Sequence, residues 1–192
     1  MGLLESIFFR DMPIPGDVNV DLDLFLGKLG EIRLGDPVGE IIRKLGPPVS
    51  WWYMKSQGIY SYPSLGITIT TEDGVTSEFI IAPLLPQYCD FIDMIREWKP
   101  YAGRIRLGEE CSWLYPGEIN PGKVEACLGV PEETQQEDLD APDGEIVLMY
   151  RHRDLECDVE FTPDMQLKAL RCWLSDEDED DVDDEDDEDE DE

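Results

Sequence analysis

The chain has 192 residues and a formal net charge of −31, from 46 acidic and 15 basic residues. This charge repels nucleic-acid phosphates and anionic membrane surfaces, so it argues against both as direct partners and favours a basic protein. No apolar run approaches the roughly 18 residues of a membrane-spanning helix, and the first residues lack the pattern of a secretory signal peptide.

Residues 1–30 form a predicted N-terminal segment. The stretch 2–10 is expected to be a short amphipathic helix, because its apolar residues recur with helical spacing. The first six residues also fit the loose pattern for N-myristoylation, with Gly2 as the acceptor. Further on, residues 21–29 alternate apolar and acidic side chains at first and fit either a strand or a short helix.

The first structural unit, residues 31–86, begins with a short extended piece and a helix that has clear start and stop signals. Asp36 is a good N-cap, and Pro37 suits the first helical position because its missing N–H is not needed there. Gly46 can end the helix in a left-handed conformation. Between them the apolar side chains follow the i, i+3, i+4, i+7 spacing of one helical face: Val38, Ile41, Ile42 and Leu45.

An antiparallel arrangement of strands is predicted after this helix. The patterns of β-branched, aromatic and alternating residues indicate strands at 50–54, 59–62, 65–70 and 75–81. Glu72-Asp73-Gly74 is a hairpin turn signal between the last two. A linking segment, 87–103, follows, and its part from 87 to 98 is predicted to be helical.

The second unit, residues 104–174, repeats the first in diverged form. Ile105-Arg106-Leu107-Gly108 matches Ile32-Arg33-Leu34-Gly35, and Asn120-Pro121 stands in the place of Asp36-Pro37. About ten extra residues, around 111–117, separate the two parts of the second copy. Strands are expected at 145–150, 155–161 and 166–174, after an acidic loop over 132–144.

The last segment, residues 175–192, is predicted to be a disordered acidic tail, because it holds 16 acids and no base. The whole pattern therefore predicts an α+β fold of two tandem helix-plus-antiparallel-sheet units and a tail.

The order of a short strand, a G-D-P or N-P helix start, a helix ending in L-G-x-P, an aromatic strand and a D-G hairpin resembles the BamE/SmpA-like unit. It is also similar to the tandem repeats of the β-lactamase-inhibitory-protein family. The resemblance covers about residues 31–81 and 104–174 and implies a non-enzymatic scaffold that binds proteins. The known relatives are exported, whereas this chain shows neither a signal peptide nor a lipoprotein cysteine, and its tail has no counterpart.

The cysteines number five and include no Cys-x-x-Cys pair. Such an odd, irregular set is typical neither of a disulfide framework nor of a zinc ribbon. Free cysteine in an apolar pattern behaves as a small buried hydrophobe, so the sequence predicts reduced thiols and a cytoplasmic location. The five residues are Cys89, Cys111, Cys127, Cys157 and Cys172.

Aromatic residues are the candidate binding residues. Consecutive residues of a strand point to opposite faces, so Trp51 and Trp52 cannot both enter one core. Exposed Trp and Tyr are typical binding anchors, although packing between the two units would explain the same residues. The insertion in the second unit is either a recognition loop or a flap over the core. The full candidate set is Trp51, Trp52, Tyr53, Tyr60, Tyr62, Trp113 and Tyr115.

A single histidine, His152, has Asp154 and Cys157 nearby, which suggests a metal site or a Cys–His pair. A zinc site needs four spaced ligands, and a nucleophile pair needs a third orienting group. The surrounding Arg-His-Arg sequence is more typical of a hairpin loop. The sequence therefore predicts no metal, no cofactor and no catalytic residue.

These observations favour a protein-binding module that is not an enzyme, of the inhibitor or immunity type, acting on a basic partner. One alternative is a chaperone or binder of basic proteins that works through the acidic tail. A second alternative is an enzyme of an unrecognised class. The sequence leaves the oligomeric state and the identity of the partner open.

Overall fold

The computed structural model describes residues 18, 20–48, 50–83, 99–137, 144–152 and 154–175. The side chains of residues 50, 52, 54 and 137 lie outside this description. Several sequence predictions fall on residues that are not described: the helices over 2–10 and 87–98, the lipidation of Gly2, the state of Cys89 and the tail after Ser175.

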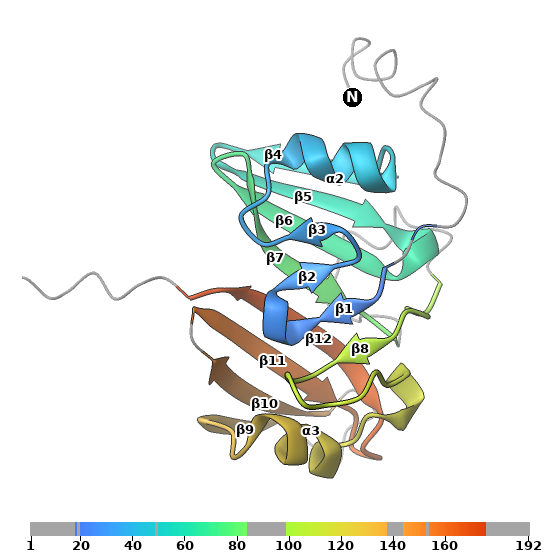
Figure 1. The fold of residues 1–192 in the computed structure, drawn as a ribbon, viewed down its shortest axis with the longest axis vertical. Coiled ribbons are helices and arrows are strands. Elements are labelled where there is room, and N and C mark those ends of the chain that lie inside the picture. Colours follow the sequence, from blue (N-terminus) through green and yellow to red (C-terminus); the bar gives the residue numbers. More distant parts are fainter. Residues whose placement is uncertain are drawn as a thin grey trace, which may run out of the picture.

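Two β-sheets dominate the described part of the chain (Figure 1). The small sheet has the order β3-β2-β1-β8, and each of its strands is two residues long. Its strands are β1 (Leu22–Asp23), β2 (Lys28–Leu29), β3 (Ile32–Arg33) and β8 (Ile105–Arg106).

The large sheet has eight strands in the order β4-β5-β6-β7-β12-β11-β10-β9, all antiparallel. Each half is a meander of four consecutive strands, and the halves meet where β7 pairs with β12. The strands are β4 (Ser50–Met54), β5 (Gln57–Tyr62), β6 (Ile67–Glu72), β7 (Val75–Ile81), β9 (Glu133–Glu137), β10 (Glu145–His152), β11 (Leu155–Phe161) and β12 (Leu167–Leu174).

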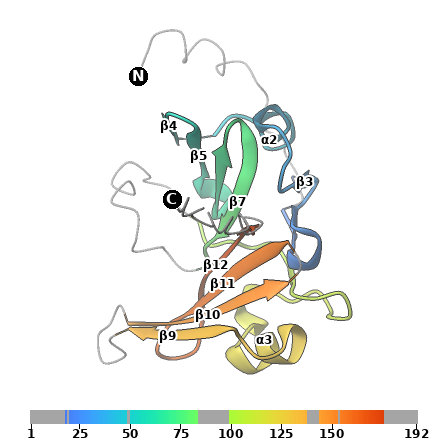
Figure 2. The ribbon, with the colours of Figure 1, turned by 90° about the vertical axis from the view of Figure 1, so that its left-hand side faces the viewer.

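The helices of the described residues are short. Each of the two α-helices has eight residues, α2 (Val38–Leu45) and α3 (Pro121–Leu128). Three 3-10 turns accompany them: η1 (Leu24–Leu26), η2 (Pro63–Leu65) and η4 (Pro116–Glu118). Figure 2 shows both α-helices and the small sheet on the same side of the large sheet. The fold therefore has two layers, one of which is a single continuous sheet.

This architecture shows that the predicted α+β fold of two separate helix-plus-sheet units is wrong. The described structure is mostly β, and the strands of both halves belong to one sheet. The cap signals correctly located two helices, but neither is long enough to cover a sheet by itself. The small sheet supplies the remaining cover, and its two-residue strands carry almost no periodic signal.

The local signals at the two helices have different outcomes. In α3, the side chain of Asn120 accepts a hydrogen bond from Lys123 N at 3.1 Å, so the predicted N-cap is confirmed. In α2 the N-cap position belongs to Pro37 and no side chain caps it. Asp36 Oδ2 instead accepts from Arg33 N at 2.9 Å and closes the preceding turn. Gly46 follows the last turn with φ of 80°, as its lack of a Cβ permits.

The core lies between the large sheet and the layer of small strands and helices. The inward side chains of the central strands, such as Phe79, Leu170 and Phe161, are fully buried. Leu22, Ile32 and Ile105 of the small sheet are also fully buried against the other side of this core. Each such side chain contributes about 1.5–3 kcal/mol to folding, so the small sheet is an essential wall of the core.

Candidate functional site

Trp51 and Tyr53 lie on the same face of β4 and are 40% and 54% exposed. Tyr60 of β5 is directly opposite Trp51 in the register and is half-buried. Among the described strands, β4 is an edge of the large sheet and pairs only with β5. We call Trp51, Tyr53 and Tyr60 the β4 aromatic patch. It combines exposed aromatic surface with an unpaired strand edge.

Tyr62 does not belong to this patch. Its side chain is buried, and its hydroxyl donates to the carbonyl of Gly46 at 3.1 Å. Burial raises the pKa of Tyr62 well above the usual value, so the phenol stays neutral. The residue therefore ties the end of α2 to the large sheet, which is a structural role. The side chain of Trp52 lies outside the described part, so its predicted role stays a prediction.

Trp113 and Tyr115 lie on the loop between β8 and α3, and both are exposed. Leu114 between them forms a bridge with Ile105 through two backbone hydrogen bonds of 2.7 and 2.8 Å. The centroid of the Trp113 ring is 5.3 Å from the guanidinium carbon of Arg104 and 5.6 Å from that of Arg106. In Figures 1 and 2 this loop lies far from β4, so the predicted aromatic residues do not form one surface.

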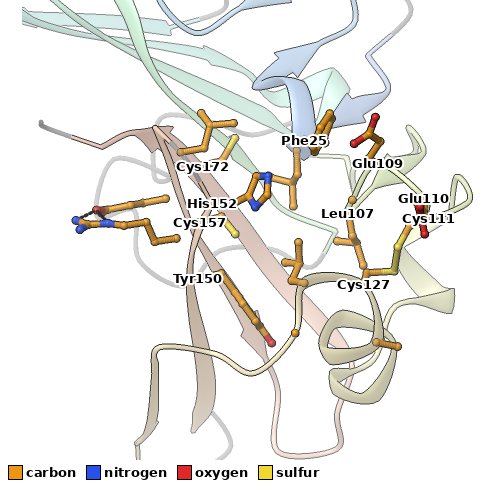
Figure 3. Close-up of a pocket in the computed structure, with 18 residues that line it drawn as sticks. Phe25, Leu107, Glu109, Glu110, Cys111, Cys127, Tyr150, His152, Cys157 and Cys172 are labelled. Atoms are coloured by element: carbon orange, nitrogen blue, oxygen red, sulfur yellow. Dashed lines mark hydrogen bonds and ion pairs between the residues drawn. A yellow bond between two sulfur atoms is a disulfide. The ribbon is translucent and has the colours of Figure 1, made fainter.

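A cavity of about 500 Å³ lies between the ends of β10–β12, the α3 helix, η1 and the loop after β8 (Figure 3). We call it the α3 cavity. Its walls are mixed, and their apolar part comes from Leu24, Phe25, Leu107, Leu128, Leu155 and the disulfide of Cys111 and Cys127. Tyr150, Cys157 and Cys172 form the side contributed by the large sheet, and Glu109, Glu110 and His152 supply polar groups.

The thiols of Cys157 and Cys172 are opposite each other in β11 and β12 and are not bonded to one another. Burial raises the pKa of Cys157 to about 12 and also raises that of Cys172. Both thiols are therefore protonated near neutral pH. Because the thiolate is the reactive form, these residues are poor nucleophiles and act as apolar wall atoms.

Tyr150 is the unusual polar residue of the α3 cavity. The residue is only 5% exposed, and none of the described groups forms a hydrogen bond with its hydroxyl. Burial raises the pKa of Tyr150 to about 12, with a smaller contribution from the charge of Glu125. The phenol is therefore neutral and can donate a hydrogen bond.

His152 is the last residue of β10 and is exposed. Its ring centroid is 5.6 Å from that of Phe25 in η1, at an interplanar angle of 42°. The sequence placed His152 in a hairpin loop; the hairpin is present, but His152 lies in its strand β10 and pairs with Leu155 of β11. Among the described residues, no group of three or more His, Cys, Asp or Glu side chains is placed to hold a metal ion.

None of the described helices is long and apolar enough to cross a membrane.

Cys111 and Cys127 form a disulfide bond, with their Cα atoms 6.0 Å apart. The predicted free thiols are wrong for this pair. The bond joins the loop after β8 to the last turn of α3, across one wall of the α3 cavity. The spacing of 16 residues matches no disulfide motif, so no local signal could have revealed the pairing. The cavity was missed for the same reason, since its walls come from four separate parts of the chain.

No protein-family model matches the sequence, and no curated protein matches it significantly. The structure is distantly similar to a DUF4309 family protein from Bacillus subtilis, with a TM-score of 0.46 and 12% identity over 77% of this chain and 84% of that one. It is also similar to a cysteine-rich secretory protein from Staphylococcus aureus, with a TM-score of 0.46 and 10% identity over 83% of this chain and 51% of that one. Likenesses this weak carry no argument about function. The resemblance to BamE/SmpA-like and β-lactamase-inhibitory-protein-like repeats stays a prediction.

Proposed function

We propose that the protein is a non-enzymatic protein-binding module whose β4 aromatic patch contacts a basic partner. The observation that carries the proposal is the exposure of Trp51 and Tyr53 together on the edge strand of the large sheet. Trp and Tyr are the residues most often found at the energetic centre of interfaces. The free N–H and C=O groups of an edge strand can also pair with an extended segment of the partner.

Charge supports a basic partner. The net charge of −31 attracts a cationic protein over distances up to about a Debye length, roughly 8 Å at physiological salt. Such attraction mainly raises the association rate and makes it sensitive to salt. An inhibitor or immunity protein acting on a cationic toxin or nuclease would use both features, and we keep this as the preferred type of module.

The cavity chemistry supports binding over catalysis. The buried thiols of Cys157 and Cys172 are protonated, and Tyr150 is a neutral phenol. A nucleophilic enzyme needs an activated thiolate or a base within hydrogen-bond reach of its nucleophile. Cys157 and Cys172 do not show the activated state that such a mechanism requires.

The test is an affinity capture from the native cells, followed by identification of the partner and titration with the purified pair. We expect a cationic partner whose affinity falls at least tenfold in the Trp51→Ala/Tyr53→Ala variant, because interface anchors contribute about 1–2 kcal/mol or more each. Tyr115→Ala is the matched control, since it removes an equally exposed tyrosine on a distant loop. Undiminished affinity in the double variant would contradict the proposal.

The acidic tail needs a separate variant, because it offers an alternative binding segment. Deleting residues 176–192 removes 16 acids and leaves the β4 aromatic patch intact. The proposal expects slower association but a bound complex. Loss of all binding after the deletion would favour the acidic-tail binder instead.

The compartment is part of the proposal. The irregular cysteines favoured the cytoplasm, whereas the Cys111–Cys127 bond is typical of an oxidising compartment. Rapid alkylation of thiols in the native cells, followed by mass spectrometry, decides between them. Unmodified, bonded Cys111 and Cys127 would rule out the reducing cytoplasm as the site of action.

A further inference from the structure

The helix α3 makes few non-covalent contacts that hold it against the large sheet. Val124 is its one buried residue, whereas α2 buries both Ile41 and Leu45. The backbone N–H of Val38 in α2 also donates to the carbonyl of Gly74, at 2.9 Å, in the turn between β6 and β7. Among the described residues, no hydrogen bond joins α3 to the large sheet in this way. Because apolar burial stabilises in proportion to the area covered, α3 is held less firmly than α2.

The docked position of α3 also leaves a polar group unsatisfied. The hydroxyl of Tyr150 is buried, and Figure 3 shows its ring extending from β10 toward α3. The charge of Glu125, which belongs to α3, helps to raise the pKa of Tyr150, so the two side chains are close in space. A buried donor that forms no hydrogen bond with a described residue is costly, and water would satisfy it if α3 moved away. This cost weighs against the docked position.

The Cys111–Cys127 bond supplies the attachment that these contacts lack. Cys127 lies in the last turn of α3, and Cys111 lies in the loop after β8. That loop is fixed to β8, because Leu114 and Ile105 exchange two backbone hydrogen bonds. The disulfide therefore connects the end of α3 to an anchored part of the chain, and it restricts the positions that α3 can take when it moves.

A reductant has access to this bond. Cys111 and Cys127 are both half-buried, and both line the α3 cavity, which is open to solvent. The thiolate of a dithiol attacks one sulfur, forms a mixed disulfide and releases the other cysteine, which takes up a proton. The second thiol of the reductant then displaces the remaining cysteine. The protein gains two electrons and two thiols, and the dithiol becomes a disulfide.

We propose that the Cys111–Cys127 bond is a redox switch that controls the docking of α3, which is released when a dithiol reduces the bond. Release uncovers the part of the large sheet that faces the α3 cavity, including Tyr150 and Cys157. Loss of burial lowers the pKa of Cys157 toward its ordinary value, so its reactive thiolate becomes more abundant. The switch lies in the second half of the large sheet and needs no contribution from the β4 aromatic patch.

The experiment uses the full chain, oxidised in a glutathione buffer until mass spectrometry shows the Cys111–Cys127 bond. Hydrogen exchange in α3 and α2 is compared before and after treatment with dithiothreitol, without denaturant. On reduction, the amides of α3 should lose at least about tenfold more protection than those of α2, because only α3 loses its attachment. After removal of the dithiothreitol, Cys157 should react with iodoacetamide at least about tenfold faster than in the oxidised chain.

The control variant is Cys111→Ser/Cys127→Ser, which lacks the bond under all conditions. Without reductant it should match the reduced wild type in both measurements, and dithiothreitol should not change it further. Circular dichroism checks that the variant is folded, and the reduced wild type provides the test if it is not. Failure of the bond to form, unchanged protection of α3, equal loss of protection in α2 and α3, or unchanged alkylation of Cys157 would each overturn the proposal.

Discussion

Asp158 and Glu160 are two residues apart on one face of β11, and each has a buried carboxylate oxygen that forms no hydrogen bond with any described residue. Burial raises the pKa of both carboxyls, and Arg171 only partly opposes this effect. The guanidinium of Arg171 is already engaged, because it donates to Glu78 at 2.8 Å. These two carboxylates are therefore unfavourable when charged, and they reduce the stability of the protein near neutral pH.

Glu160→Gln is predicted to stabilise the protein by about 1 kcal/mol at pH 7, because it removes an unsatisfied buried charge. The unfolded pKa of a glutamate is about 4.3, and the folded pKa is higher. The folded state then binds more protons between these values, so wild-type stability falls as pH rises through this window. The gain should shrink when urea unfolding is measured at pH 5 instead of pH 7.

The control for this prediction is Glu78→Gln, which breaks the ion pair with Arg171 and should destabilise the protein at pH 7. If Glu160→Gln lowers the free energy of unfolding as Glu78→Gln does, the prediction that the charged form of Glu160 destabilises the protein is wrong.

At the scale of single elements, the sequence predicted those parts that are determined by local chemistry. The Asn120 cap, the end of α2 at Gly46 and the Asp73-Gly74 hairpin, where both residues have positive φ, are all present. It failed for β9, which was predicted as part of a loop. This edge strand consists of Glu, Thr and Gln, and its described side chains are exposed, so it needs no apolar face. The backbone pairing with β10 makes this segment a strand, and such pairing requires no particular amino-acid composition.

The candidate site was less predictable than the elements. Trp51 and Tyr53 were among the candidates because consecutive aromatic residues in a strand cannot all face one core. The α3 cavity was not, because η1, the loop after β8, α3 and β10–β12 meet only in the folded chain. The Cys111–Cys127 bond belongs to the same class of non-local contact.

The disulfide is predicted to stabilise the element pair that it joins. Closing a loop of about 16 residues lowers the entropy of the unfolded chain and contributes roughly 3 kcal/mol. The Cys111→Ser/Cys127→Ser variant should therefore unfold at a lower urea concentration than the wild type. Dithiothreitol should lower the wild-type midpoint and leave that of the double variant unchanged. Equal midpoints for the oxidised wild type and the double variant would show that the bond does not stabilise the fold.

At the scale of the whole molecule, the junction of β7 and β12 determines the architecture. Ile81 pairs with Leu170, and Phe79 pairs with Cys172, although about 90 residues separate them along the chain. The strands of each half show a clear meander in the sequence, but nothing local specifies that the last strand of one half pairs with the last strand of the other. Two separate units were predicted for this reason, and one sheet is observed.

A continuous sheet with a shared core predicts cooperative unfolding of both halves. Phe79 is fully buried at the junction and lies between Ile69 of β6 and Cys172 of β12 in the register. Phe79→Ala leaves a cavity there and should lower the free energy of unfolding by about 3–5 kcal/mol. Because both halves contact this position, hydrogen exchange should accelerate together in β6 and in β11. Val75→Ala, on the exposed end of the same strand, should change the stability by less than about 0.5 kcal/mol.

Urea unfolding followed by tryptophan fluorescence and by far-ultraviolet circular dichroism distinguishes the two architectures. In one cooperative sheet, the loss of Phe79 shifts both signals by the same amount, and a single transition is retained. Two units that fold separately would give two transitions, with the second half unaffected by a change in β7. Faster exchange confined to β4–β7 would likewise contradict the shared core, because the pairing of β7 with β12 would then contribute little to the stability of either half.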